Sequence, residues 1–156
     1  MKSPNISYYT ADWMVTLNSY LQVIPQYIMS VTDIKFDDNR FDYIICSHVL
    51  DDVDDDRKAL REMYRVLKSG GQAIIAVPAD LEMPVTVEFD ETPEKKSLKL
   101  HLKISAENKR VYGADFIDIL AGEGFEVSLI LSSSMNDSIR NYALRKSDCL
   151  YVCTKK

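Results

Sequence analysis

Two continuous apolar segments, separated by an amphipathic one, constrain the fold of this chain more than any other feature. FDYIICS (41–47) and QAIIAVP (72–78) are rich in β-forming residues without polar alternation, which is typical of strands buried on both faces. Between them, residues 51–71 carry an apolar stripe at helical spacing, with Asp54 or Asp55 as candidate caps and Gly70 and Gly71 as the stop. The stripe consists of Ala59, Leu60, Met63, Tyr64 and Leu67. Strand, helix and strand in this order predict a parallel βαβ unit with a right-handed crossover.

The same alternation continues on both sides of this unit. Residues 6–10, 14–24 and 26–33 are typical of a strand, a helix and a strand. A short helix is expected from residue 114, with Phe116, Ile117 and Leu120 facing inward, and further strands over 125–131 and 149–154. We therefore predict a single α/β domain over residues 1–156, with a doubly wound, mostly parallel sheet flanked by helices.

One stretch follows a different period. Residues 84–89 and 98–104 alternate apolar with polar positions on either side of a charged connector, which predicts an antiparallel hairpin at about 84–104. Because a two-stranded ribbon is not stable alone, its apolar face must be covered. Either the rest of the domain or another subunit can supply that cover.

Composition excludes several classes of function. The 156 residues include 19 basic and 24 acidic ones, for a net charge of −5, and there is no basic cluster of the kind that binds nucleic acid. We expect no membrane span, no secretory signal and no metal site. Cys46, Cys149 and Cys153 are an odd count, and the last two would be too far apart on one strand to form a disulfide. These features favour a cytoplasmic protein.

Residues that follow the predicted strands are the candidate ligand contacts, since ligands of open α/β sheets bind beyond the carboxyl ends of the strands. Asp12 and Asp33 each follow a strand, and their carboxylates can accept hydrogen bonds from ribose hydroxyls or an adenine amino group. Ser47 and His48 follow the strand at 41–47. Histidine titrates near neutral pH, so His48 is a candidate base; alternatively, it holds its loop by a hydrogen bond to the backbone.

Three segments together resemble a known family. TDIKFDDNRFDYIICSHVLDDVDDDRKALREMYRVLKSGGQAIIAVP (32–78) is similar to the middle of class I S-adenosylmethionine-dependent methyltransferases of the "methyltransferase type 11" kind. KRVYGADFIDILAGEGFEV (109–127) resembles a later segment of that family, and YYTADW (8–13) resembles its second strand. The resemblance implies a seven-stranded sheet with one antiparallel strand near its edge. It also implies S-adenosylmethionine as the cofactor and a methyl acceptor that the sequence does not identify.

The resemblance also assigns roles to residues of this chain. Asp12 would hold the ribose, and the other cofactor contacts would be Asp33, Ile34, Ser47 and His48. Asp51 would face the substrate, and it stands with Asp52 where the family has glutamate and histidine (HVLDDV in place of HVLEHV). Tyr112, in the YG pair before a helix, either lines a substrate pocket or packs in the core.

The chain departs from the family at its start. Residues 1–69 contain no glycine, so the glycine-rich cofactor loop has no counterpart, and the chain resembles a family member truncated at the N-terminus. Three hypotheses remain: a working methyltransferase completed by an unusual route, a catalytically silent binding or regulatory subunit, and a truncated remnant. Because the missing strand lies mid-sheet in the family, open strand edges predict a homodimer. The 84–104 hairpin or the N-terminal strand would be exchanged or packed across its interface.

Overall fold

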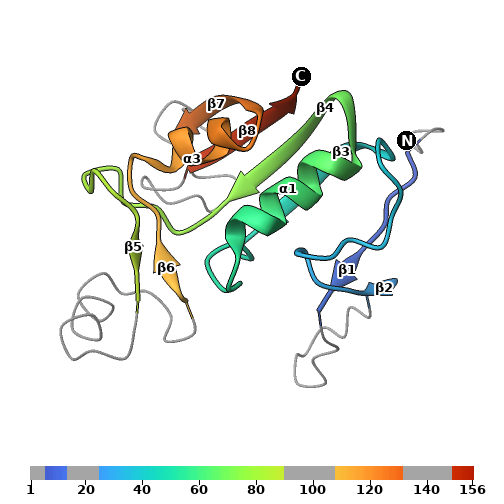
Figure 1. The fold of residues 1–156 in the computed structure, drawn as a ribbon, viewed down its shortest axis with the longest axis horizontal. Helices are drawn as coiled ribbons and strands as arrows, with labels where there is room; N and C mark the ends of the chain where they lie inside the picture. Colours follow the sequence, from blue (N-terminus) through green and yellow to red (C-terminus); the bar gives the residue numbers. More distant parts are fainter. Residues whose placement is uncertain (1–5, 14–24, 90–107, 132–148) are drawn as a thin grey trace, which may run out of the picture.

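A four-stranded sheet forms the body of the protein. The computed structural model describes residues 6–13, 25–89, 108–131 and 149–156 of the chain (Figure 1). The strand order is β3 (Phe41–Ser47), β4 (Leu67–Ala76), β8 (Cys149–Lys155) and β7 (Phe125–Leu131). β3 and β4 are parallel, whereas β8 runs antiparallel to both β4 and β7. The predicted α/β class is confirmed, and so is an antiparallel strand in a sheet that contains a parallel βαβ unit.

Helix α1 (Asp56–Val66) connects β3 to β4, as the sequence pattern predicts. Asp55 is its cap: the carboxylate accepts the backbone N–H of Lys58 at 2.8 Å. The helix ends earlier than expected, because Leu67 turns to extended geometry and pairs with Phe41. The predicted helix stop at Gly70 therefore lies inside β4 instead, although its φ of +76° is left-handed, as expected of one of the two glycines.

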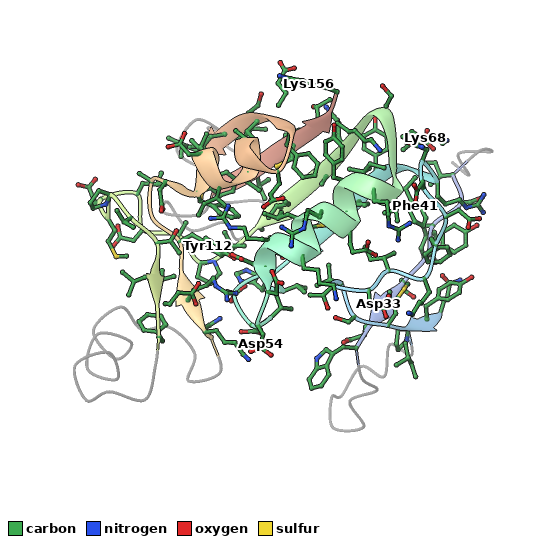
Figure 2. The ribbon with its side chains drawn as sticks, in the orientation of Figure 1. Asp33, Phe41, Asp54, Lys68, Tyr112 and Lys156 are labelled. Carbon is green, nitrogen blue, oxygen red and sulfur yellow. The ribbon has the colours of Figure 1, made fainter. Side chains whose placement is uncertain are left out.

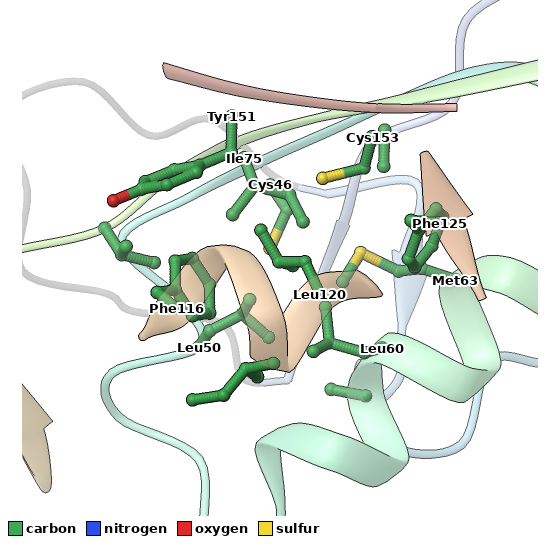
Figure 3. Close-up of a cluster of buried hydrophobic side chains, with 14 of the residues drawn as sticks. Cys46, Leu50, Leu60, Met63, Ile75, Phe116, Leu120, Phe125, Tyr151 and Cys153 are labelled. Atoms are coloured by element: carbon green, nitrogen blue, oxygen red, sulfur yellow. The ribbon is translucent and has the colours of Figure 1, made fainter. Parts of the chain in front are cut away.

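The hydrophobic core lies between one face of the sheet and helices α1 and α3 (Phe116–Gly122), which share that face (Figures 1 and 3). Phe116 is central to it, with its ring centroid 3.9 Å from that of Tyr112 and 4.8 Å from that of Tyr151. Of the residues predicted to face inward, Phe116 and Leu120 are fully buried, and so are the helical-stripe residues Ala59, Leu60, Met63 and Leu67. The covered face of the sheet is therefore the one that the apolar periodicity predicts.

A second, two-stranded sheet precedes the main one. β1 (Ala11–Asp12) and β2 (Tyr27–Ile28) pair in parallel, as expected, but both strands are much shorter than the predicted 6–10 and 26–33. The predicted helix at 14–24 lies outside the described residues. The Tyr9 ring packs 5.9 Å from that of Phe41, centroid to centroid, and so connects this small sheet to the beginning of β3.

The antiparallel pairing expected at 84–104 forms with a different partner. β5 (Val87–Glu88) pairs with β6 (Arg110–Val111), and the N–H of Phe89 donates to the Lys109 carbonyl at 2.7 Å. The predicted second strand, 98–104, lies outside the described residues. The residue after β6 also pairs with the segment that follows β4, since the N–H of Tyr112 donates to the Pro78 carbonyl at 3.1 Å. The ribbon is thereby attached to its own domain.

The cysteines behave as small core residues. Cys46, Cys149 and Cys153 are buried thiols, and no disulfide joins Cys149 to Cys153. Burial raises the pKa of the Cys46 and Cys153 thiols to about 12, which keeps them protonated. Neither of the described helices is long and apolar enough to cross a membrane.

Candidate functional site

The residues predicted to hold a cofactor divide between two sheets. Asp12 ends β1 in the two-stranded sheet, is exposed, and accepts the Trp13 N–H on Oδ1 at 2.7 Å. Ser47 ends β3 in the four-stranded sheet, and His48 follows it. Among the described residues no strand joins the two sheets. The structure therefore leaves Asp12 and Ser47 at the ends of strands that are not neighbours.

Ile34 is fixed against α1 through its backbone. Its N–H donates to Glu62 Oε2 at 2.9 Å, and its carbonyl accepts Arg65 Nη2 at 2.8 Å. Arg65 also binds the Glu62 carboxylate and holds its pKa below the usual range. Asp33, one residue earlier, keeps an exposed carboxylate that pairs with Lys35 (Figure 2). Asp33 is thus a surface carboxylate on an anchored backbone, which suits a contact with a polar ligand.

His48 bends the chain at the end of β3. Its φ of +52° is left-handed, a conformation that costs a residue with a Cβ roughly 1–2 kcal/mol. Its N–H donates to the Ala76 carbonyl at 2.9 Å, so the bond that holds this position comes from the backbone while the imidazole is exposed. A strained residue beyond the carboxyl end of a strand is typical of functional sites.

Asp51, three residues later, is buried with one oxygen unsatisfied. Its side chain is 1% exposed, and Asn108 Nδ2 donates to Oδ2 and also to Asp52 Oδ1, the latter at 3.1 Å. Oδ1 makes no hydrogen bond in the part of the chain that the structure describes. Burial raises the pKa of Asp51, as does the charge of Asp52, while His48 and Arg110 lower it. Asp51 is therefore a buried carboxyl with free accepting capacity beside His48.

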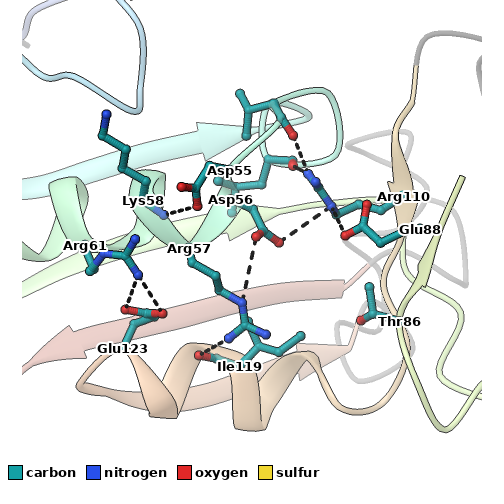
Figure 4. Close-up of polar contacts among 12 residues, drawn as sticks. Asp55, Asp56, Arg57, Lys58, Arg61, Thr86, Glu88, Arg110, Ile119 and Glu123 are labelled. Atoms are coloured by element: carbon teal, nitrogen blue, oxygen red, sulfur yellow. Dashed lines mark hydrogen bonds and ion pairs between the residues drawn. The ribbon is translucent and has the colours of Figure 1, made fainter. Parts of the chain in front are cut away.

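Arg110 contacts the backbone of the loop between β3 and α1, which contains His48 and Asp51 (Figure 4). Its guanidinium, 3% exposed, donates to the carbonyls of Leu50 and Val53, both at 2.6 Å, and of Asp54 at 3.1 Å. It also pairs with Glu88 on β5 at 2.7 Å and lies 3.7 Å from Asp56. One side chain from β6 thus satisfies three carbonyl groups in the loop between β3 and α1.

Tyr112 also binds the loop between β3 and α1. It is fully buried, and its hydroxyl donates to Asp56 Oδ2 at 2.9 Å and to the Leu50 carbonyl at 3.2 Å. Burial raises the pKa of this phenol far above its ordinary value. Of the two interpretations of Tyr112, packing fits its enclosed side chain, which binds the loop between β3 and α1 through its hydroxyl. Asp33 and Tyr112 lie toward opposite ends of α1 (Figure 2).

The sequence pointed to Ser47, His48 and Asp51 because they follow a strongly patterned strand, but it missed Asn108 and Arg110. These two residues lie more than fifty positions along the chain from the carboxylate and carbonyls that they bind. A single buried arginine has no periodicity, so no local signal could have identified it.

A shallow hollow of about 350 Å³ lies at the other end of the sheet. It is lined by Asp42, Tyr43 and residues 68–71, around the beginning of β3 and the first part of β4. Ser47 and His48 lie at the opposite end of β3. Since ligands of such sheets bind at the carboxyl ends, the hollow is not part of the candidate site.

Sequence comparison finds a likeness to methyltransferases over part of the chain. Residues 6–75 match a family described as "Methyltransferase domain". The chain is also similar to a demethylmenaquinone methyltransferase from Staphylococcus carnosus, with 35% identity over 80 residues, covering 51% of this chain and 33% of the relative. The chain therefore resembles methyltransferases over somewhat less than half of its residues. It spans about a third of the length of the curated relatives that it matches.

Solved structures show the same fold at low sequence identity. The 4+2 cyclase SpnF superimposes with a TM-score of 0.57 and 18% identity, covering 83% of this chain and 56% of that one. A SAM-dependent methyltransferase from Thermotoga maritima gives a TM-score of 0.52 and 20% identity, covering 86% of this chain and 65% of that one. The fold is therefore that of Rossmann-like methyltransferases, and it is shared by a protein named for a different reaction.

Proposed function

We propose that this protein is an S-adenosylmethionine-dependent methyltransferase acting on an unidentified acceptor. The observation that carries the proposal is the match of residues 6–75 to the methyltransferase domain, because those residues include every candidate cofactor contact. We assign Asp12 to the ribose hydroxyls and Asp33 and Ile34 to the adenine. Ser47 and His48, at the carboxyl end of β3, complete the proposed set of cofactor contacts. Asp12 and Asp33 are exposed, and their carboxylates match the donors of adenosine.

The residues present fit the adenosyl end of the cofactor better than its methionyl end. Residues 1–69 contain no glycine, so none of them offers the side-chain-free backbone that lets a ligand approach closely. When bound, the cofactor supplies an activated methyl group, and the protein contributes proximity and alignment.

His48 and Asp51 are our candidates on the acceptor side. The exposed imidazole of His48 can take a proton from the methyl acceptor. Asp51 Oδ1 is buried and makes no hydrogen bond in the described structure, so it can accept a hydrogen bond from the same acceptor.

We also propose a second function, because Asp12 and Ser47 end strands of two sheets that no strand of the described residues joins. In this alternative the chain is a catalytically silent relative that acts as a binding or regulatory subunit. Such a protein keeps the fold without a complete cofactor site, consistent with the rule that fold does not dictate function.

Calorimetric titration with S-adenosylhomocysteine distinguishes the two. We expect micromolar binding by the wild-type chain and at least tenfold weaker binding by Asp12→Ala and by Asp33→Ala. Asp118→Ala is the matched control, since Asp118 is an exposed carboxylate on α3. Absence of heat up to millimolar ligand, with a folded protein by circular dichroism, refutes the methyltransferase proposal and favours the silent subunit.

A further inference from the structure

Strand β3 has one edge that no strand of the described residues occupies. It pairs with β4 on one side and is the terminal strand of the four-stranded sheet. The N–H of His48 donates toward β4, to the Ala76 carbonyl. Because backbone groups of successive residues in a strand point to alternate sides, those of Tyr43, Ile45 and Ser47 point away from β4. Among the described residues, none hydrogen-bonds to that edge.

The side chains along this edge are apolar and exposed. Tyr43 is 66% and Ile45 is 78% exposed, and both project from the sheet face opposite to that of the buried Cys46. Native proteins usually protect an edge strand with charged residues, proline or a covering element. Between Tyr43 and Cys46 this strand has no charged residue and no proline. The continuous apolar sequence of β3 is typical of a strand that is buried on both faces and paired on both edges.

We propose that β3 pairs antiparallel with β3 of a second copy of this chain, about a twofold axis at Ile44. The two four-stranded sheets then form one continuous sheet. In this register Tyr43 lies opposite Ile45 of the second copy, and Ile45 lies opposite its Tyr43. These residues exchange the backbone hydrogen bonds that the open edge leaves unmade.

The chemistry of the strand favours a second copy over a different partner. Tyr43 opposite Ile45 is an aromatic residue paired with a β-branched one, a stabilising cross-strand combination, and twofold symmetry produces it twice. Asp42 is the one charged residue of β3, and the register sets it opposite the neutral Cys46 of the second copy. Like charges therefore do not meet across the interface, and every residue from Phe41 to Ser47 has a partner.

This dimer differs from the exchange of a hairpin that the sequence suggested. In the described structure β5 pairs with β6 of its own chain, so this part of the ribbon is not exchanged. The pairing uses backbone groups along β3, and the mass of the assembly is measured without any cofactor present. Its success or failure is therefore independent of the proposed methyltransferase activity.

Light scattering after size-exclusion chromatography, at several micromolar concentrations, tests the proposal with the whole chain. We expect the mass of two chains for the wild type and for the control Val85→Lys, since Val85 is 60% exposed but lies outside the strands. Tyr43→Lys should give the mass of one chain. Ile45→Pro should do the same, because proline removes an outward N–H that β4 does not use.

Cross-linking tests the register. Residue 44 faces its own symmetry mate at a non-hydrogen-bonded position, where Cα atoms approach to about 4.5 Å, within disulfide range. Mild oxidation should therefore link Ile44→Cys into a dimer, but not Val85→Cys. A wild-type mass of one chain at every concentration overturns the proposal. So does a dimer that persists in folded Tyr43→Lys and Ile45→Pro, and an uncrosslinked Ile44→Cys overturns the register.

Discussion

Arg110 is the residue whose loss should most disturb the loop after β3. We consider Arg110→Met, which keeps an unbranched side chain but removes the guanidinium. The substitution breaks hydrogen bonds to three carbonyls, of Leu50, Val53 and Asp54, and the ion pair with Glu88. It also leaves the largely buried Asp56 without the cation that lies 3.7 Å away.

The magnitude follows from burial. At 3% exposure, Arg110 binds its partners where water cannot replace it. Removing one partner of a buried ion pair typically costs about 3–5 kcal/mol, because the remaining charge and the carbonyls stay desolvated. For a chain of this size, each kcal/mol lowers the melting temperature by about 2–4 °C. Arg110→Met should therefore melt roughly 6–20 °C below the wild type, and Arg110→Lys should lie between them, because a lysine ammonium cannot reach all of these acceptors.

Thermal and urea unfolding followed by circular dichroism measure the effect. Arg61→Met is the matched control: Arg61 pairs with Glu123 at 3.4 Å, but its side chain is 56% exposed. Exposed pairs contribute about 0–1 kcal/mol, so this variant should unfold close to the wild type. If Arg110→Met loses no more stability than Arg61→Met, the assignment of Arg110 as the main support of the loop is refuted.

Three further outcomes follow from the structure. Because burial raises the pKa of Asp51, its carboxyl keeps its proton to higher pH in the native state than in the unfolded state. The free energy of unfolding, relative to that of Asp51→Asn, should therefore fall as the pH rises from about 4. Parallel curves for the two proteins in urea titrations would contradict this. A Cβ at Gly113 would lie 2.6 Å from the backbone carbon of Val85, so Gly113→Ala should lose about 1–3 kcal/mol, whereas Gly122→Ala, with open space, should not; equal midpoints would argue against this packing. The cysteines should resist a thiol reagent until the protein is denatured, since burial raises the pKa of Cys46 to about 12; rapid labelling of the native protein would show that the core is open.

The βαβ unit was predictable because its signals are local. The apolar runs at 41–47 and 72–78 and the helical stripe between them specify element types by period alone, and Asp55 caps α1 as expected. The end of α1 was not predictable to the residue. Leu67 fits the helical stripe, yet it pairs with Phe41 in the sheet, so a contact between distant segments decided where the helix ends.

The candidate site divides in the same way. Ser47, His48 and Asp51 could be named from the sequence because they follow a recognisable strand. Their environment could not: the burial of Asp51 and the support from Asn108 and Arg110 depend on a segment more than fifty residues away.

The sequence by itself determined the α/β class, the resemblance to methyltransferases and the strand ends at which a cofactor is expected, because periodicity and motif are properties of neighbouring residues. Only the tertiary structure decided that Tyr112 supports a loop, that β5 pairs with β6, and that no strand of the described residues pairs with the outer edge of β3. Those outcomes depend on which distant groups satisfy each other's hydrogen bonds and cover each other's apolar surface, and a linear pattern does not contain that information.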